Sequence, residues 1–190
     1  MKLFCKPLHT HSKILYEKGL VGYRSFREED YDMIHGWVNE PYARRYWQLD
    51  GTKDLVRDTY DKILASPYAH SFIGLYDNKP VAQVDVYLVA LDELQHHIKR
   101  EPDDCGLHFL MAPPRQLKRG MGLTMLRGFI DFYFSFPEAK RLFAEPDREN
   151  LKANVLAQRA GFNYVDSLRL PDKYATLYCI TRENFLATSN

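Results

Sequence analysis

The sequence lacks the features that mark membrane, secreted or metal-dependent proteins. None of its apolar runs approaches the roughly 20 residues that a membrane-spanning helix needs, and the first 13 residues (MKLFCKPLHTHSK) lack the apolar centre of a signal peptide. The three cysteines, Cys5, Cys105 and Cys179, are odd in number and have no metal-ligand spacing, which argues against a disulfide framework. We therefore expect a cytoplasmic protein with no metal and no membrane partner.

Excess charge and internal repetition are also missing. Lys and Arg total 26 and Asp and Glu total 25, which gives a net charge of +1, so the composition gives no reason to expect nucleic acid as a partner. No linker, repeat or low-complexity tract interrupts the 190 residues, and this length suits one well-buried core. We expect a single domain over 1–190, with 1–18 as an N-terminal extension, that is either a monomer or a homodimer.

The spacing of apolar residues predicts a mixed α/β chain. Asp77-Asn78 separates two alternating runs and predicts a hairpin, while the polar segment 91–104 suits a mobile loop or short helix that covers a substrate. Helices packed on a largely antiparallel sheet are the predicted architecture. Helical spacing covers 27–38, 42–47, 52–65, the run after 122 and 149–160, and strands are expected at 20–26, 70–76, 79–89, 107–111, 141–144, 162–170 and 173–181, with a possible one at 2–8.

A glycine turn at 118–122 (KRGMG) lies between a short apolar strand and a strongly apolar helix. The first turn of a helix has backbone N–H groups without intrahelical acceptors, and the positive end of the helix dipole faces the same way. Such a turn therefore suits a phosphate group, and Lys118 and Arg119 add positive charge.

The turn and its surroundings resemble the R/Q-x-x-G-x-G/A signature of the GNAT acyltransferase superfamily. The strand end before it, the later Asn150 and the LAQRAGF ending at 156–162 are also typical of that superfamily. The resemblance implies an α+β fold whose central, largely antiparallel twisted sheet is flanked by helices and splayed at the acyl-CoA site. It implies acetyl-CoA or another acyl-CoA as co-substrate, bound by Leu110, Met111, Ala112, Leu117, Lys118, Arg119, Gly120, Met121, Gly122 and Asn150.

Further motifs resemble the siderophore-biosynthesis branch, whose members acylate N-hydroxylysine or related hydroxylamines to give hydroxamates that chelate ferric iron. These motifs are WVNEP at 37–41 with Tyr46-Trp47, DVY at 85–87, GLH at 106–108 and EPD at 145–147. The implied reaction is direct acetyl or succinyl transfer to an N-hydroxylated diamine or lysine. The small-molecule acceptor would contact Trp37, Asn39, Tyr46, Trp47, Gln48, Asp85 and Tyr87.

Within this resemblance, His108 and Asp147 are the candidate catalytic residues. His108 would act as a base or would orient the N–OH group, and Asp147 would fix the imidazole tautomer. A hydrogen-bonded core histidine is the structural alternative for His108, and a cap for the helix at 149–160 is the alternative for Asp147. A nucleophilic Cys105 and a metal-binding His96-His97 pair are both disfavoured, because neither has suitable partners in the sequence.

Two positions depart from the superfamily pattern. Leu117 stands where Arg or Gln is usual, so the phosphate cradle would depend on the backbone. Ala157 stands where many members have a tyrosine general acid, and a weakly basic hydroxylamine acceptor needs less proton management than an alkyl amine. These departures leave two alternatives open: a GNAT enzyme for another amine, such as a protein N-terminus or an aminoglycoside, and a non-catalytic acyl-CoA-binding module.

Overall fold

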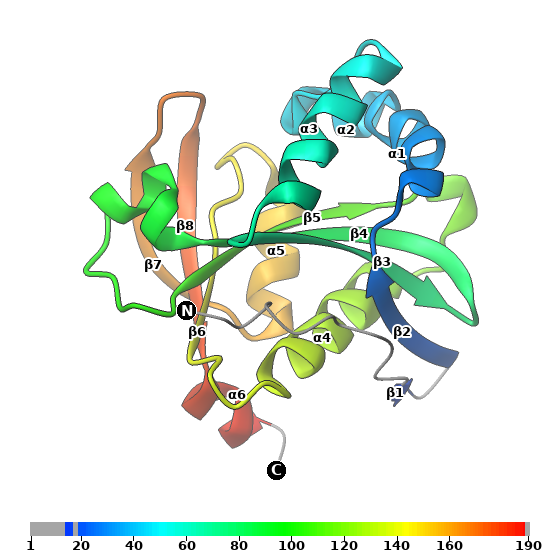
Figure 1. The fold of residues 1–190 in the computed structure, drawn as a ribbon. Helices are drawn as coiled ribbons and strands as arrows, with labels where there is room; N and C mark the ends of the chain where they lie inside the picture. The colour runs from blue at the N-terminus through cyan, green and yellow to red at the C-terminus, as the bar shows by residue number, and fades with distance from the viewer. Residues whose placement is uncertain (1–13, 17–18, 189–190) are drawn as a thin grey trace.

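One twisted sheet with helices on both faces organises the chain (Figure 1). The computed structural model describes residues 14–16 and 19–188, and the strand expected at 2–8 lies outside them. The strand order is β1-β2-β3-β4-β5-β6-β8-β7, and every neighbouring pair is antiparallel except β5 and β6. The strands are β1 Ile14–Tyr16, β2 Gly19–Ser25, β3 Ala69–Tyr76, β4 Lys79–Leu88, β5 Cys105–Met111, β6 Arg141–Ala144, β7 Asn163–Arg169 and β8 Tyr174–Thr181.

The helices form two layers. Three of them lie on one side of the sheet, above it in Figure 1, whereas α4 packs across the other side. The α-helices are α1 Tyr31–Val38, α2 Pro41–Trp47, α3 Lys53–Ala65, α4 Met121–Phe134, α5 Leu151–Ala160 and α6 Arg182–Thr188, and single 3₁₀ turns occupy η1 Glu28–Asp30, η2 Val89–Leu91, η3 Glu93–His96 and η4 Pro114–Gln116. The predicted α+β fold is confirmed.

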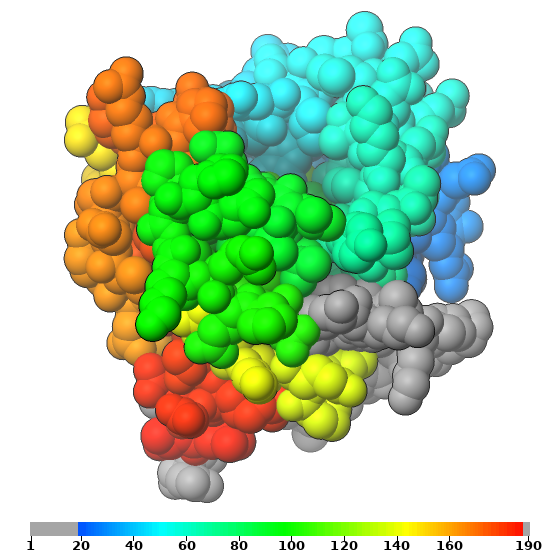
Figure 2. Space-filling view, turned by 60° about the vertical axis from the view of Figure 1, so that its left-hand side comes forward, coloured from blue at the N-terminus to red at the C-terminus, as the bar shows by residue number. Residues whose placement is uncertain are grey.

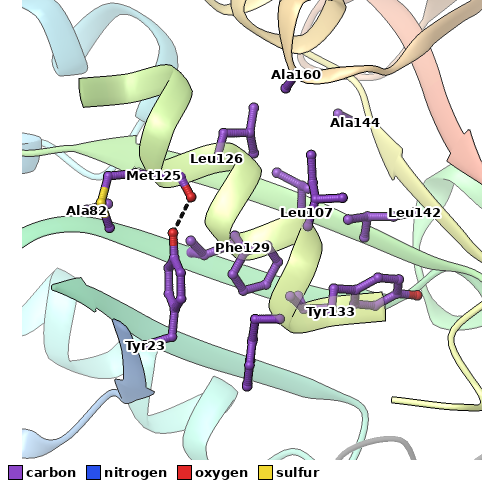
Figure 3. Close-up of a cluster of buried hydrophobic side chains, with 14 of the residues drawn as sticks. Tyr23, Ala82, Leu107, Met125, Leu126, Phe129, Tyr133, Leu142, Ala144 and Ala160 are labelled. Carbon is purple, nitrogen blue, oxygen red and sulfur yellow. Dashed lines mark hydrogen bonds between the residues drawn. The ribbon is translucent and has the colours of Figure 1, made fainter. Parts of the chain in front are cut away.

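β4 is buried on both faces, and the core under α4 covers one of them. Ala82, Val84 and Val86 join Phe129 and other apolar residues of α4 in one cluster. Figure 3 shows this packing, with the Tyr23 hydroxyl donating to the carbonyl of Met125. Because side chains alternate along a strand, the polar residues of β4 between these positions must face the other layer.

The single parallel pair of strands creates an opening in the sheet. β5 and β6 are paired only at Cys105 with Leu142 and at Gly106 with Phe143. β6 ends at Ala144, whereas β5 continues to Met111 with β4 as its partner. The remainder of β5 therefore has one edge without a strand, which is the splay that the resemblance implied.

The structure tests two local predictions. The helix expected from 149 begins at Leu151, because the Asn150 side chain caps it by accepting from the N–H of Ala153 at 3.1 Å. The segment 91–104 contains a short helix, η3 Glu93–His96, as one of the two predictions for it had it, and it is packed on the fold. Leu94 is buried in a cluster with residues of β6 and β8, and Asp104 accepts two hydrogen bonds from Arg141. No helix within the described ranges is long and apolar enough to cross a membrane.

Candidate active site

A pocket of about 440 Å³ lies where β5 and β6 separate. Its walls come from the end of α2, one side of α3, the exposed edge of β5, the loop between β6 and α5, α5 itself and the β7–β8 turn. In Figure 2 the surface is hollowed between the cyan helices and the orange β7–β8 hairpin. None of the lining residues belongs to segment 91–104, and the expected role of that segment as a substrate cover stays a prediction.

His108 faces this pocket with its ring held from behind. The His108 side chain is 46% exposed, and its Nε2 lies 3.1 Å from Oε1 of Glu145, whose side chain is only 5% exposed. The hydroxyl of Tyr87 donates to the other Glu145 oxygen, Oε2, at 2.9 Å. The ammonium of Lys173 lies 3.7 Å from Oε1 of Glu145. Three polar partners thus compensate the cost of burying the Glu145 carboxylate.

The sheet register explains how Tyr87 reaches Glu145. Tyr87 on β4 is opposite Gly106 on β5, and the tyrosine ring lies across the glycine. A Cβ on Gly106 would lie 2.2 Å from Cζ of Tyr87, so no larger residue fits there while the ring stays in place. Gly106 therefore permits the Tyr87–Glu145 hydrogen bond that holds the carboxylate next to His108.

Glu145 stabilises the protonated form of His108. Burial lowers the pKa of His108, but the hydrogen bond and charge of Glu145, together with the charge of Asp85, outweigh burial and raise it. Burial likewise raises the pKa of Glu145, and here the contacts with His108, Lys173 and Tyr87 prevail and lower it. The contact therefore favours a protonated His108 beside an ionised Glu145.

Asp85 is a second buried acid in the pocket wall. It pairs with His108 across β4 and β5, and it accepts a hydrogen bond from Nε2 of Gln83, which also donates to the hydroxyl of Ser71 at 2.9 Å. Burial raises the pKa of Asp85 to about 6, and the positive charge of His108 limits that rise. Asp85 and His108 thus present to the same space a carboxylate of raised pKa and an imidazole whose protonated form is favoured.

The end of α2 forms the opposite wall, as the sequence predicts. Tyr46, Trp47 and Gln48 all line the pocket, and the Trp47 ring stands edge-on to His108 with centroids 6.2 Å apart. Arg45 forms an ion pair with Glu149 at 2.5 Å. This ion pair joins the end of α2 to the loop before α5 beside the pocket. Of the predicted acceptor contacts on β4, Asp85 lines the pocket and Tyr87 lies behind it as the partner of Glu145.

Trp37 and Asn39 are not in the pocket, which corrects two predicted substrate contacts. Trp37 is 4% exposed and belongs to the apolar cluster between α1, α3 and the sheet. Asn39 caps α1: its amide donates to the carbonyl of His35 at 2.9 Å and its oxygen accepts from the N–H of Gly51 at 3.1 Å. The motif they belong to stabilises the α1–α2 corner and places the end of α2.

The predicted partner of His108 is also corrected. Asp147 lines the pocket, but its carboxylate accepts from the N–H of Glu149 at 2.7 Å in a local turn, and Glu145 is the acid that contacts His108. Nor does Asp147 cap α5, since Asn150 does so. Glu145 was missed although it is in the EPD motif and directly follows the strand expected at 141–144, because the sequence does not show which of the two acids of that motif contacts His108.

The glycine turn is built as a helix start. Gly120 has φ +85° and is the N-cap residue of α4, a backbone conformation that glycine adopts without strain. Leu117 packs against both major apolar clusters, which explains an apolar residue at this position. The ammonium of Lys118 lies 5.6 Å from the centroid of the Tyr76 ring. Direct phosphate contacts by 118–122 stay a prediction.

The remaining predicted cofactor residues have different surroundings. The side chains of Leu110 and Ala112 are buried in an apolar cluster, so only their backbone can face a ligand. The carbonyl of Met111 accepts from the Tyr42 hydroxyl at 2.5 Å. Asn150 lines the pocket while capping α5.

Burial disfavours a nucleophilic role for Cys105. Burial raises the pKa of the Cys105 thiol to about 11, which makes it a poor nucleophile. Across residues 14–16 and 19–188, no three His, Cys, Asp or Glu side chains are grouped as metal ligands.

Comparison with known proteins identifies the family. Residues 27–170 match the family described as acetyltransferase (GNAT) domain, and the chain belongs to that family. It is 24% identical over 157 residues to N(6)-hydroxylysine O-acetyltransferase of Escherichia coli, covering 82% of this chain and half of that protein. It is also 27% identical over 158 residues to the lysine N-acyltransferase MbtK of Mycolicibacterium paratuberculosis, covering 83% and 72% of the two chains.

Enzymes for another class of acceptor are equally similar. An aminoglycoside N(6')-acetyltransferase type 1 of Klebsiella pneumoniae is 26% identical over 171 residues, covering 87% of this chain and 85% of that one. The crystal structure of the aminoglycoside acetyltransferase AAC(6')-Ib with coenzyme A has a TM-score of 0.82 at 24% identity, covering 90% and 99% of the chains. This protein is therefore an acyl-CoA-dependent N-acyltransferase of the GNAT type, and its acceptor must be inferred from the pocket.

Replacing Gly106 by alanine tests the support behind Glu145. The new Cβ would displace the Tyr87 ring and break its bond to Glu145, so we expect the free energy of unfolding to fall by about 1–3 kcal/mol and turnover to fall with it. Denaturant titration and steady-state assays measure both effects. Gly36→Ala, at an exposed position of α1 with open space around it, should instead stabilise by about 0.5–1 kcal/mol; equal behaviour of the two variants contradicts this account.

Glu145→Gln tests the ion pair. The amide keeps a hydrogen-bond acceptor but removes the charge, so the pKa of His108 should fall in the variant. An NMR titration of the imidazole resonances measures this change. Glu149→Gln, which neutralises an exposed acid paired with Arg45, is the matched control and should leave the His108 pKa in place. An unchanged pKa in Glu145→Gln would mean that Glu145 does not hold the proton on His108.

Proposed function

We propose that this enzyme transfers an acetyl or succinyl group from acyl-CoA to the hydroxylamine nitrogen of an N-hydroxylated diamine or lysine. The product is a hydroxamate, and the reaction is a step in the cytoplasmic biosynthesis of a hydroxamate siderophore for iron acquisition. The acyl group passes directly from CoA to the acceptor while both are bound.

The protonation states in the pocket carry this proposal. An alkylammonium has a pKa of about 10.4, so an enzyme that acylates one must first remove a proton. Asp85 and His108 suit that task poorly, because burial raises the pKa of Asp85 only to about 6 and Glu145 favours the protonated form of His108. A hydroxylamine is far less basic, so it is already neutral and nucleophilic near pH 7 and needs no strong base.

The shape and relatives of the site agree with this acceptor. The Tyr46-Trp47-Gln48 wall and the β5 edge leave a pocket of about 440 Å³, a size typical of small-molecule sites. Relatives named for N-hydroxylysine and N-hydroxyputrescine acylation match 82–83% of this chain. Acylation of an aminoglycoside is the alternative that the comparisons keep open.

The acyl-CoA has a natural path through the splay. Its pyrophosphate lies on the turn 118–122, where the start of α4 provides backbone donors and a positive dipole end. Its pantetheine arm follows the free edge of β5 towards His108, and α5 closes the other side through Leu156 and Ala157, which line the pocket. The thioester thus meets the acceptor between β5 and β6.

Removing the charges on the glycine turn tests this placement. In a Lys118→Ala/Arg119→Ala double variant we expect the Kd for CoA to rise about tenfold, or about 1.4 kcal/mol, and its salt dependence to weaken, with kcat nearly unchanged. Calorimetric titration of CoA at two ionic strengths measures this. A Lys62→Ala/Lys140→Ala variant, which removes two exposed charges elsewhere, is the control. Equal Kd values for CoA in the two double variants would show that Lys118 and Arg119 do not contribute to CoA binding.

An acceptor panel tests the proposed function itself. We expect kcat/KM for N-hydroxylysine, N-hydroxyputrescine or N-hydroxycadaverine to exceed that of the parent amines and of kanamycin by at least about a hundredfold at pH 7.5. CoA release measures total turnover, and the coloured ferric complex measures hydroxamate. A higher kcat/KM for kanamycin or a peptide N-terminus would show that the proposed acceptor is wrong. CoA binding without any turnover would indicate a non-catalytic module.

A further inference from the structure

We propose that Asp85 accepts the proton of the attacking nitrogen and that the His108 imidazolium donates the proton that leaves with CoA. This division of roles rests on the proposed function, because a carboxylate suffices as base only for a weakly basic acceptor. It also assigns the proton donor that the missing tyrosine at position 157 leaves open.

The surroundings of Asp85 can stabilise both of its protonation states. As a carboxylate it accepts a hydrogen bond from Nε2 of Gln83. As a carboxylic acid it needs an acceptor, and the amide that contacts it carries one: Oε1 of Gln83 is buried and has no hydrogen-bond partner in the described part of the chain. An unpaired buried polar atom is costly, and rotation of this amide would let it accept from protonated Asp85.

Asp85 is also placed for contact with the acceptor. It is 92% buried, yet it lines the pocket together with His108, its opposite residue on β5. The acceptor side of the same space is walled by Trp47 and by Thr59 and Ile63 of α3. A nitrogen that attacks a thioester beside His108 therefore has the Asp85 carboxylate on its β4 side.

His108 is placed to donate a proton. Its Nε2 is engaged by Glu145, which leaves the other edge of the ring for the pocket. The charged groups acting on it are Glu145 after β6, Asp85 on β4 and Lys173 in the β7–β8 turn, with Asp92 between η2 and η3 also interacting. Glu145 and Asp85 favour the imidazolium, whereas burial and Lys173 oppose it.

The reaction then balances in protons and bonds. The acceptor nitrogen forms a bond to the thioester carbonyl carbon, and its N–H proton passes to Asp85. The C–S bond breaks, and the sulfur takes a proton from the imidazolium. The proton on Asp85 then returns to His108, its neighbour across the two strands, so the site is restored as CoA and hydroxamate leave.

The pH–rate profile separates the two roles. Activity needs ionised Asp85, which is lost as the pH falls through about 6, and protonated His108, which is lost as the pH rises through its raised pKa. We expect a bell-shaped kcat/KM profile in the wild type. Asp85→Asn should reduce kcat/KM by about 10²–10⁴-fold and remove the acid limb, while His108→Ala should remove the alkaline limb.

A matched variant controls for electrostatics. Asp92→Asn removes one negative charge that also acts on His108, but Asp92 does not line the pocket, and the asparagine oxygen can still accept the hydrogen bond from the N–H of Leu94. It should keep activity within about threefold and both limbs of the profile. An Asp85→Asn variant that behaves like Asp92→Asn would overturn the role of Asp85.

Chemical rescue decides whether His108 acts as acid or base. In His108→Ala, added imidazole should restore turnover in proportion to the imidazolium concentration, so rescue should grow as the pH falls from 8 to 6.5. Rescue that instead follows neutral imidazole and grows with pH would make His108 the base and overturn the proposal.

The rescue experiment is independent of the acceptor's identity. It uses whichever acceptor of the panel the wild-type enzyme acylates fastest, with CoA affinity and circular dichroism showing that each variant is folded. If the wild type prefers a non-hydroxylated amine, the proposed function fails, and rescue by imidazolium still tests the role of His108. If hydroxylamines are preferred and rescue follows neutral imidazole, only the division of roles fails.

Discussion

The divergence of β5 from β6 is the constraint on which the site depends. Two residue pairs join these strands, and beyond them the sheet opens into the pocket. The opening gives His108 a free side on which to meet a ligand, while Glu145, the first residue after β6, reaches back across the gap to hold the ring. A continuous sheet would fill this space with backbone hydrogen bonds and leave no room for a thioester.

A buried carboxylate fixes the chemistry within that opening. Glu145 is stable in its position because Tyr87, Lys173 and His108 surround it, and Tyr87 reaches it because Gly106 has no side chain. The resulting charge on His108 and the weak basicity of Asp85 limit the nitrogen that the site can activate. Fold and charge distribution therefore act together: the splay admits acyl-CoA and the acceptor, and the buried charges favour an acceptor that is neutral before it binds.

Much of this arrangement is visible in the sequence, because it depends on local signals. Alternation on either side of Asp77-Asn78 gives the β3–β4 hairpin, whose turn residues have positive φ, and Gly120 indicates where α4 begins. His108, Asp85 and the Tyr46-Trp47-Gln48 wall could be predicted from motifs. The contacts between distant segments could not: Trp37 and Asn39 share a motif with pocket residues but serve the α1–α2 corner. The choice of Glu145 over Asp147 depends on which acid after β6 reaches the His108 ring on β5.

The most direct measurement is a competition for limiting acyl-CoA. Equal concentrations of N-hydroxycadaverine and cadaverine are offered together at pH 7.5, and the two acylated products are quantified by mass spectrometry. The charges in the pocket predict that the hydroxamate exceeds the simple amide by at least about a hundredfold. A product mixture dominated by the amide would show that the site removes a proton from an alkylammonium, and it would contradict the account of Asp85 and His108 given above.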